Sequence, residues 1–526
     1  MDFIDKRTLA AIILSLVVLI GYQFLLPKPT PQPPQKIETV PEVMKKETAP
    51  AAVTLPSGKG STETKDVRVE TDYYIATLTS KGGTVKAFEL KSYRDKMGGS
   101  DVSLLKNPGV LPPLALGLNT DNFALAQLNF SLEGAAVVLK DNQTGSIVFS
   151  YSSPQFSIKR TYTFYAGQYK FDLRDEVTGL PELWITLGSD FGIFDTKDRT
   201  APHVGPVILK DTDRIEVPKT LGLIARIFSL FSEAKKIDEP QNYKGGIHWI
   251  AQEDKYFFAA IVPSGQEHEA EAWKQKDSFA VAMKLQPGVN DFMIYAGPKE
   301  YERLQKLDVG LEHIIDFGFF SILARPLFWV LKFFYKFLGN YGWSIVLLTI
   351  IVRIPFIPLI NKGQKSMRKM QELQPKLSEI KEKYKKDPQK MQHETMEIYK
   401  KYKVNPVGGC LPMLLQIPVF YALYKVLMIA IELRGAPFVF WITDLSAKDP
   451  YYILPVIMGI TMVLQQKMTP SSLDPSQNKM MMLMPVVFTF LFLNFASGLV
   501  LYWLINNILS ISQQFYTNKR VSLQRR

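Results

Sequence analysis

The chain has 526 residues, more than one ordinary domain holds, so several domains are expected. Its net charge is +12, with 47% hydrophobic and 21% charged residues. A single cysteine excludes a disulfide framework and a multi-cysteine zinc site. The five histidines show no ligand spacing, so we expect neither a metal nor a cofactor. The positive charge is typical of cytoplasmic loops that face anionic lipid, and nucleic-acid binding is the rival interpretation.

Residues 1–27 are predicted to form an uncleaved membrane anchor, the first span. An apolar run from Thr8 to Leu26 follows Lys6 and Arg7, and no small-residue cleavage site comes after it. The two basic residues place the N-terminus in the cytoplasm. Residues 28–65 are rich in Pro, Lys, Glu and Thr and contain too few apolar residues for a core, so we expect a flexible linker outside the cytoplasm.

Residues 66–296 have the pattern of an all-β domain. Polar and apolar residues alternate around Gly82-Gly83, which predicts a hairpin, and similar short runs recur to residue 296. We expect one antiparallel β-sandwich, with a short helical or loop excursion at Leu221–Phe231. No GxSxG motif, P-loop or recognisable carboxylate pair appears, so a scaffold is favoured over an enzyme. Carbohydrate sites leave weak marks in a sequence, and that alternative stays open.

Residues 297–340 are predicted to form a helix outside the cytoplasm followed by an amphipathic helix. Phe317–Leu338 is apolar enough for a span, but Arg325, Lys332 and Lys336 stand at i, i+7 and i+11 on one helical face. A basic stripe on an aromatic helix favours a helix that lies along the membrane surface.

Residues 341–361 form the second predicted span. The stretch GWSIVLLTIIVRIPFIPLIN contains one charge, Arg353, and the prolines Pro355 and Pro358 are expected to bend the helix. Arg353 either reaches headgroups along its own stem or faces a polar cavity. We favour the cavity, because a charge inside a membrane segment is usually functional.

Residues 362–405 are predicted to form a basic cytoplasmic hairpin of two antiparallel helices. Residues 362–403 contain about thirteen Lys or Arg against six Asp or Glu, and Asp387-Pro388 interrupts the helical periodicity. The sequence leaves two interpretations open, a solvated charged loop or a docking arm for acidic partners. The candidate docking residues are Lys376, Lys381, Lys383, Lys385 and Lys386.

Four more apolar segments complete a scheme of six spans, with both chain ends in the cytoplasm. Loop charges agree with this orientation. Lys425 should lie near the outer interface, where its side chain can reach the headgroups. The predicted spans are 408–432, 451–466, 480–496 and 498–515, separated by an outer loop at 433–450 and a cytoplasmic loop at 467–479, and followed by a basic tail at 516–526.

The last five spans contain no Asp or Glu in their cores, which argues against an ion-coupled transporter. They do contain neutral polar residues, each of which could simply join two helices by a hydrogen bond. Together with Arg353 they suggest a hydrated groove facing the cytoplasm. These residues are Thr349, Gln416, Thr461, Gln465, Thr489, Asn494, Asn506, Asn507, Ser510 and Gln513.

Four long motifs closely resemble the Oxa/Alb/YidC family of membrane protein insertases. They are VRIPFIPL around Arg353, KVNPVGGCLPMLLQIPVFYALY at 403–424, APFVFWITDLSAKDPYYILPVIMGITM at 436–462 and FASGLVLYWLINN at 495–507. The match covers about Gly297 to Gln514. It extends more loosely to the anchor and to the β region, which looks like the periplasmic domain of the Gram-negative type.

The resemblance implies a polytopic α-helical inner membrane protein, with five spans forming a core bundle around a groove open to cytoplasm and lipid. The β domain should be galactose-mutarotase-like without that activity, and an uncharged residue is expected in place of Lys425. The implied partners are nascent membrane proteins, the ribosome, the Sec translocon with its accessory subunits and membrane lipids, but no specific DNA. The candidate groove residues are Arg353, Thr349, Gln416, Tyr502, Trp503 and Asn506.

Two rival functions remain open. A small-solute transporter or channel would need a groove open on both sides and carboxylates inside the membrane. A membrane-tethered carbohydrate-binding protein would place the function in the β domain.

Overall fold

The computed structural model describes most of the chain from residue 63 onward. The predicted anchor at 1–27, most of the predicted linker and the excursion expected at Leu221–Phe231 lie outside the described residues. The described ranges are 63–95, 99–106, 111–195, 201–218, 240–265, 268–276, 278–402, 404, 407–469 and 475–524.

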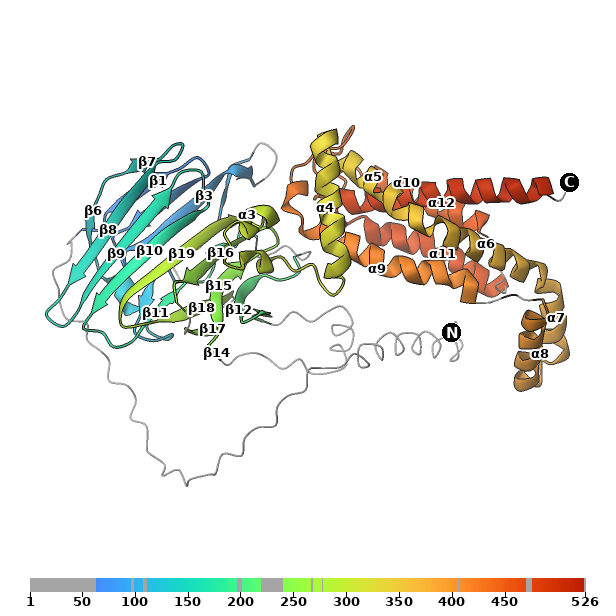
Figure 1. Cartoon of the computed structure of the whole chain (residues 1–526), viewed down its shortest axis with the longest axis horizontal. Helices are drawn as coiled ribbons and strands as arrows, with labels where there is room; N and C mark the ends of the chain where they lie inside the picture. Colours follow the sequence, from blue (N-terminus) through green and yellow to red (C-terminus); the bar gives the residue numbers. More distant parts are fainter. Residues whose placement is uncertain are drawn as a thin grey trace, which may run out of the picture. The chain divides into compact units, whose positions relative to one another are not determined.

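Strands between Asp66 and Pro298 form three sheets, which confirms the predicted β domain (Figure 1). The pairings are antiparallel except between β1 and β7, which run parallel. A five-stranded sheet has the order β4 (Asp101–Ser103), β3 (Thr84–Arg94), β2 (Tyr74–Thr79), β1 (Asp66–Glu70), β7 (Val137–Val138). A nine-stranded sheet has the order β13 (Asp213–Glu216), β12 (Gly205–Lys210), β15 (Ile247–Glu253), β16 (Phe257–Pro263), β19 (Gly288–Pro298), β10 (Lys170–Thr178), β9 (Ser157–Tyr165), β8 (Thr144–Ser152), β6 (Ser131–Glu133). A second five-stranded sheet has the order β14 (Gln241–Lys244), β17 (Glu269–Gln275), β18 (Ser278–Leu285), β11 (Leu183–Thr186), β5 (Leu116–Gly117), and the 3₁₀ turn η1 spans Ala124–Gln127.

The predicted hairpin joins β2 to β3, with Thr79 opposite Thr84. Gly82 and Gly83 have φ angles of 69° and 57°, a left-handed conformation that glycine adopts at no steric cost. The two glycines therefore explain why the chain reverses here.

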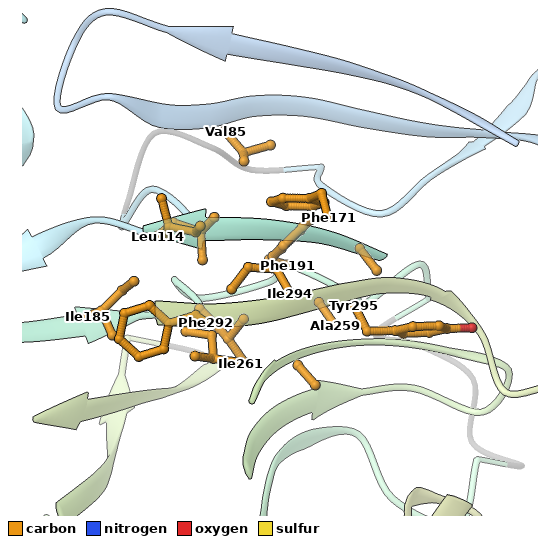
Figure 2. Close-up of a cluster of buried hydrophobic side chains, with 14 of the residues drawn as sticks. Val85, Leu114, Phe171, Ile185, Phe191, Ala259, Ile261, Phe292, Ile294 and Tyr295 are labelled. Carbon is orange, nitrogen blue, oxygen red and sulfur yellow. The ribbon is translucent and has the colours of Figure 1, made fainter. Parts of the chain in front are cut away.

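The core of the β domain is made by residues that alternate along the strands. In β10, Phe171, Leu173, Asp175 and Val177 are buried, while the residues that alternate with them are partly or fully exposed. Figure 2 shows Val85 of β3, Phe171 of β10 and Ile185 of β11 in one buried cluster, so side chains from all three sheets contribute to the core. This packing is the predicted sandwich interior.

The rest of the described chain is helical. The second predicted span is α5 followed by α6, with a 3₁₀ turn at the predicted interruption, where Pro355 and Pro358 lie. The helices are α3 (Tyr301–Gln305), η2 (Leu311–Ile314), α4 (Ser321–Leu338), α5 (Tyr341–Arg353), η3 (Ile354–Phe356), α6 (Ile357–Glu372), α7 (Gln374–Lys383), α8 (Pro388–Lys401), α9 (Val407–Ile429), η4 (Ile431–Leu433), α10 (Ile453–Met468), α11 (Pro475–Phe492) and α12 (Ser497–Gln524).

One helical stretch in the described part, Tyr341–Glu372, is long and apolar enough to cross a membrane by itself. Gln416–Ile429, Ile453–Met468 and Met481–Phe492 are shorter apolar helices. Helix α12 contacts α5, α9 and α10, and α10 also contacts α11, so these segments form one bundle (Figure 1).

Helix α4 departs from its predicted basic stripe. Arg325 and Lys336 are exposed, but Lys332 lies 3.1 Å from Glu302 and 3.3 Å from Glu432. The nearby carboxylates hold Lys332 within the protein, so only two of the three cations can face headgroups.

The hairpin of residues 362–405 has the predicted break. Asp387 caps α8 by accepting the backbone N–H of Lys390 at 3.0 Å, and Pro388 starts the helix. Helix α6 runs continuously from the bundle to Glu372, so the first arm is split at Leu373 into α6 and α7.

The helices of the last two predicted spans do not share the predicted span bounds, which stay a prediction. Helix α11 ends at Phe492, before the predicted 496, and α12 continues to Gln524, past the predicted 515. The turn between them is fixed by Ser497, whose N–H and hydroxyl both donate to the carbonyl of Ala447, at 2.7 and 2.9 Å.

Candidate functional site

A pocket of about 320 Å³ lies among α5, α6, α9, α10 and α12. We name it the Arg353 pocket. Six of its ten lining residues are neutral polar or aromatic groups that can donate or accept hydrogen bonds. It is lined by Arg353, Ile360, Gln416, Ile417, Phe420, Gln465, Tyr502, Trp503, Asn506 and Ser510.

The charge of the pocket comes from Arg353, the last residue of α5. Its Nη1 donates to Oδ1 of Asn506 at 2.7 Å, and its Nη2 donates to Oε1 of Gln513 at 3.2 Å. Gln513 in turn donates to Oδ1 of Asn361 at 2.9 Å. Within the described residues these partners are all uncharged, so they orient the guanidinium while leaving its positive charge uncompensated.

Another part of the lining is aromatic and carries one polar pair. Gln416 on α9 donates to the hydroxyl of Tyr502 on α12 at 3.2 Å. Phe420 stacks on Tyr502 with ring centroids 6.2 Å apart and meets Trp503 edge-on at 4.8 Å. The pocket therefore has one cationic side and one apolar side that can adapt to different side chains.

Five of the six predicted groove residues line this pocket, and Thr349 is the exception. Thr349 is buried, and its hydroxyl donates to the carbonyl of Ile345 at 2.6 Å, one turn back in its own helix. Its role in a substrate path stays a prediction.

The sequence analysis did not select Ile360, Ile417 or Phe420, which the structure adds to the pocket. Phe420 lies four residues after Gln416 on α9, so both side chains share one helical face. This spacing from Gln416 could have identified Phe420 as a pocket residue. Gln465 and Ser510 belonged to the predicted polar set without being chosen as site residues.

The five candidate docking lysines are exposed on α7 and the turn after it. Lys376 interacts with the hydroxyl of Tyr402 and lies 4.5 Å from its ring centroid, which joins the two arms of the hairpin. His393, Glu394 and Glu397 on α8 have ligand atoms within 4.8 Å of one another, but exposed groups of this kind are common at helical spacing.

Lys425, predicted to lie near the outer interface, has a partner within the protein, and its depth in the membrane stays a prediction. Its Nζ lies 3.3 Å from Oδ2 of Asp316 in the segment before α4. Asp316 also accepts the N–H of Gly318 at 2.8 Å, so the carboxylate is fixed in place. Lys425 is thus engaged by a protein carboxylate, which accounts for a charge at a position where an uncharged residue was expected.

The comparisons with known proteins cover nearly the whole chain. Residues 66–330 match the family model described as the YidC periplasmic domain, and residues 333–524 match the 60Kd inner membrane protein model. The membrane protein insertase YidC of Geotalea daltonii is 40% identical over 98% of this chain and 99% of its own length. The YidC of Syntrophus aciditrophicus is 39% identical over 98% of this chain and 100% of its own length.

Solved structures are more distant. A crystal structure of an active YidC insertase is 19% identical, covering 87% of this chain and 94% of its own, with a TM-score of 0.39. A galactose mutarotase-like protein from Lactobacillus casei covers 44% of this chain and 100% of its own at 8% identity, with a TM-score of 0.27. At these scores the mutarotase-like architecture of the β domain stays a prediction. Both family models and the full-length identity to the curated relatives show that the chain belongs to the Oxa/Alb/YidC family of membrane protein insertases.

Proposed function

We propose that the chain inserts nascent membrane proteins by receiving their polar tails in the Arg353 pocket. The observation that carries this proposal is a cation held among Asn506 and Gln513, neutral partners in the described chain. An arginine at the centre of an isolated membrane helix costs roughly 2.5–3.5 kcal/mol, so its retention there favours a role in binding.

The pocket would lower the barrier to moving a short tail across the bilayer. Its polar lining shortens the low-dielectric path, and the uncompensated guanidinium offers transient pairing to an acidic tail. The apolar part of the substrate would then leave sideways into lipid, driven by about 25 cal/mol per Å² of apolar surface buried. Each step is binding or partitioning, so no residue needs to act as a chemical catalyst.

The proposed topology has six spans with both termini in the cytoplasm. It rests on the positive charge of the hairpin and of the tail, and on the apolar composition of α5, α9, α10, α11 and the first part of α12. The pocket would open to the cytoplasm and to lipid, and the β domain would lie in the periplasm.

The exposed lysines of the hairpin, Lys381 and Lys383 among them, are proposed to dock the ribosome. The Sec translocon and its accessory subunits are proposed as further partners, on the resemblance stated above.

The first test is reconstitution of the full chain in liposomes, followed by insertion of a single-span protein with a short acidic tail. Wild type, Arg353→Ala and Arg353→Lys are compared, with Arg325→Ala at an exposed position of α4 as the matched control. We expect insertion by wild type and the control, loss with alanine and rescue with lysine. Unchanged insertion by Arg353→Ala would show that Arg353 only fixes the orientation of its helix in the membrane. Solute flux without insertion by wild type would favour the transporter.

The carbohydrate-binding alternative concerns the β domain, where a cavity of about 450 Å³ is lined by Asp121, Phe123 and Trp273 among others. Phe123 and Trp273 stack with their centroids 6.1 Å apart. Deleting residues 67–296 separates the two functions. An insertase should largely keep its activity, whereas a tethered binding protein should lose it.

A further inference from the structure

A second depression lies between α10 and α11, and it shares no lining residue with the Arg353 pocket. Its volume is about 490 Å³. We name it the α10–α11 groove. Ile460 and Phe490, on opposite walls, are 63% and 68% exposed, so the groove faces outward from the bundle.

The groove exists because two helices touch at one small residue. A Cβ atom at Gly459 would overlap the hydroxyl of Thr489, so the two helices approach closely there. The Thr489 hydroxyl donates to the carbonyl of Pro485 at 2.7 Å, within its own helix. The hydroxyl proton is therefore used within the helix, and the walls beside the contact are mostly apolar.

One end of the groove carries a positive charge. Val456, Ile460 and Leu464 follow one another at every fourth residue along α10, and Lys467, exposed, continues the same face in the last turn of the helix. From Val456 to Lys467 the helix rises about 16 Å. The hydrocarbon core of a bilayer is about 30 Å thick, so this length equals the depth of one leaflet.

The size of the groove distinguishes between two apolar occupants. A helix is about 10–12 Å across, so a helical segment 16 Å long would need well over about 1,000 Å³. The groove offers about 490 Å³, which suits a single hydrocarbon chain. The cation at its end is complementary to a phosphate.

We infer that the α10–α11 groove binds an anionic phospholipid of the leaflet on the Lys467 side. One acyl chain lies along Val456, Ile460 and Leu464, and the phosphate meets Lys467. This inference is independent of the role of Arg353, because it uses a different surface.

Native mass spectrometry of the full-length protein in detergent tests it, with dioleoyl phosphatidylglycerol and dioleoyl phosphatidylcholine as the added lipids. Wild type should retain phosphatidylglycerol more tightly than phosphatidylcholine. Lys467→Gln should weaken phosphatidylglycerol about fivefold and leave phosphatidylcholine unchanged. Ile460→Trp, which fills the groove, should lower the binding of both lipids.

Two matched controls keep the test specific. Lys448→Gln removes an exposed lysine elsewhere, and Ile457→Trp adds the same bulk to an exposed position of α10 outside the groove. The inference would be overturned if a control variant lost as much lipid binding as the groove variant that it matches. It would also be overturned if neither groove variant lost any lipid binding. A co-purifying polypeptide displaced by Ile460→Trp, with lipid retention unchanged, would also overturn it in favour of a protein partner.

Discussion

Nη1 of Arg353 on α5 lies 2.7 Å from Oδ1 of Asn506 on α12, and this hydrogen bond joins two helices that are 153 residues apart in the chain. Asn506 accepts without adding charge. The pair therefore fixes the direction of the guanidinium and preserves its positive charge, which is the property that the proposed insertion step needs.

Two substitutions of Asn506 should separate orientation from charge. Asn506→Leu removes the acceptor of Arg353. It should lower the free energy of unfolding in detergent by about 1–3 kcal/mol, because the partly buried guanidinium loses a hydrogen-bond partner. Asn506→Asp should keep or raise stability, since it forms an ion pair with Arg353, but it should reduce insertion of a substrate with an acidic tail. Full insertion by Asn506→Asp would contradict the charge-based role of the pocket, and Ser512→Ala at an exposed position of α12 outside the pocket serves as the control.

The β domain contains a buried pair and an exposed pair of the same kind, which makes a direct comparison. Arg160 and Asp175 are bridged at 2.8 and 3.1 Å with both side chains fully buried. Arg174 and Asp291 are bridged at 2.6 and 3.0 Å with both side chains exposed, 56% and 43%.

Arg160→Met should destabilise the β domain by about 3–5 kcal/mol, because Asp175 would remain buried without its cation. Arg174→Met should cost less than about 1 kcal/mol, because water solvates the free Asp291. Hydrogen exchange of the β9 and β10 amides in the full chain measures both. Similar losses of protection in the two variants would refute the role of burial.

Glu253 should make the β domain sensitive to acid. Burial raises the pKa of its carboxyl, but the charges of Arg214 and Lys299 and a hydrogen bond with His203 outweigh that effect, so the pKa lies well below its usual value. The folded state thus binds fewer protons than the unfolded one. The stabilisation is complete above the unfolded pKa of about 4.3 and is lost as the pH falls below it toward the folded value.

Hydrogen exchange of the β15 amides at several pH values checks this, as the difference between wild type and Glu253→Gln. The difference cancels the contribution of Asp254, whose pKa burial raises and whose effect has the opposite sign. We expect a large difference at pH 6 that shrinks below about pH 4. A constant difference would show that Glu253 acts through packing, and Glu176→Gln at an exposed pair is the control.

The ion pair of Lys425 with Asp316 should couple α9 to the segment before α4. Lys425→Met and Asp316→Asn should each lower thermal stability in detergent, and the double variant should lose less than the sum, with an interaction energy of about 0.5–3 kcal/mol. Additive losses would mean that the two side chains act separately.

The hairpin lysines should make ribosome binding depend on salt. Affinity falls as salt rises, because each phosphate contact releases a counterion. Replacing Lys381, Lys383, Lys385 and Lys386 by Gln should reduce the steepness of log affinity against log salt by about three. Co-sedimentation with ribosomes between low and physiological salt measures the slope. A control with four exposed lysines of the β domain replaced should behave as wild type, using Lys81, Lys140, Lys159 and Lys276.

The sequence by itself determined the elements whose signal is local. The glycine pair at 82–83, the alternation along β10 and the Asp387-Pro388 cap act through neighbouring residues, so the hairpin, the strand faces and the start of α8 could be predicted. The family could also be predicted from the sequence, since the long motifs around Arg353 and Tyr502 resemble those of its members.

Only the tertiary structure decided how distant groups pair. Helical spacing placed Lys332 on a basic stripe and Lys425 at an interface, but Glu302, Glu432 and Asp316 lie on other segments and hold these lysines within the protein. Likewise, Arg353 was identified as an intramembrane charge, whereas its neutral partners and the aromatic wall at Phe420 depend on how α5, α9 and α12 pack. Charge and hydrogen-bond energies depend on distance in space, and periodicity along the chain does not contain that distance.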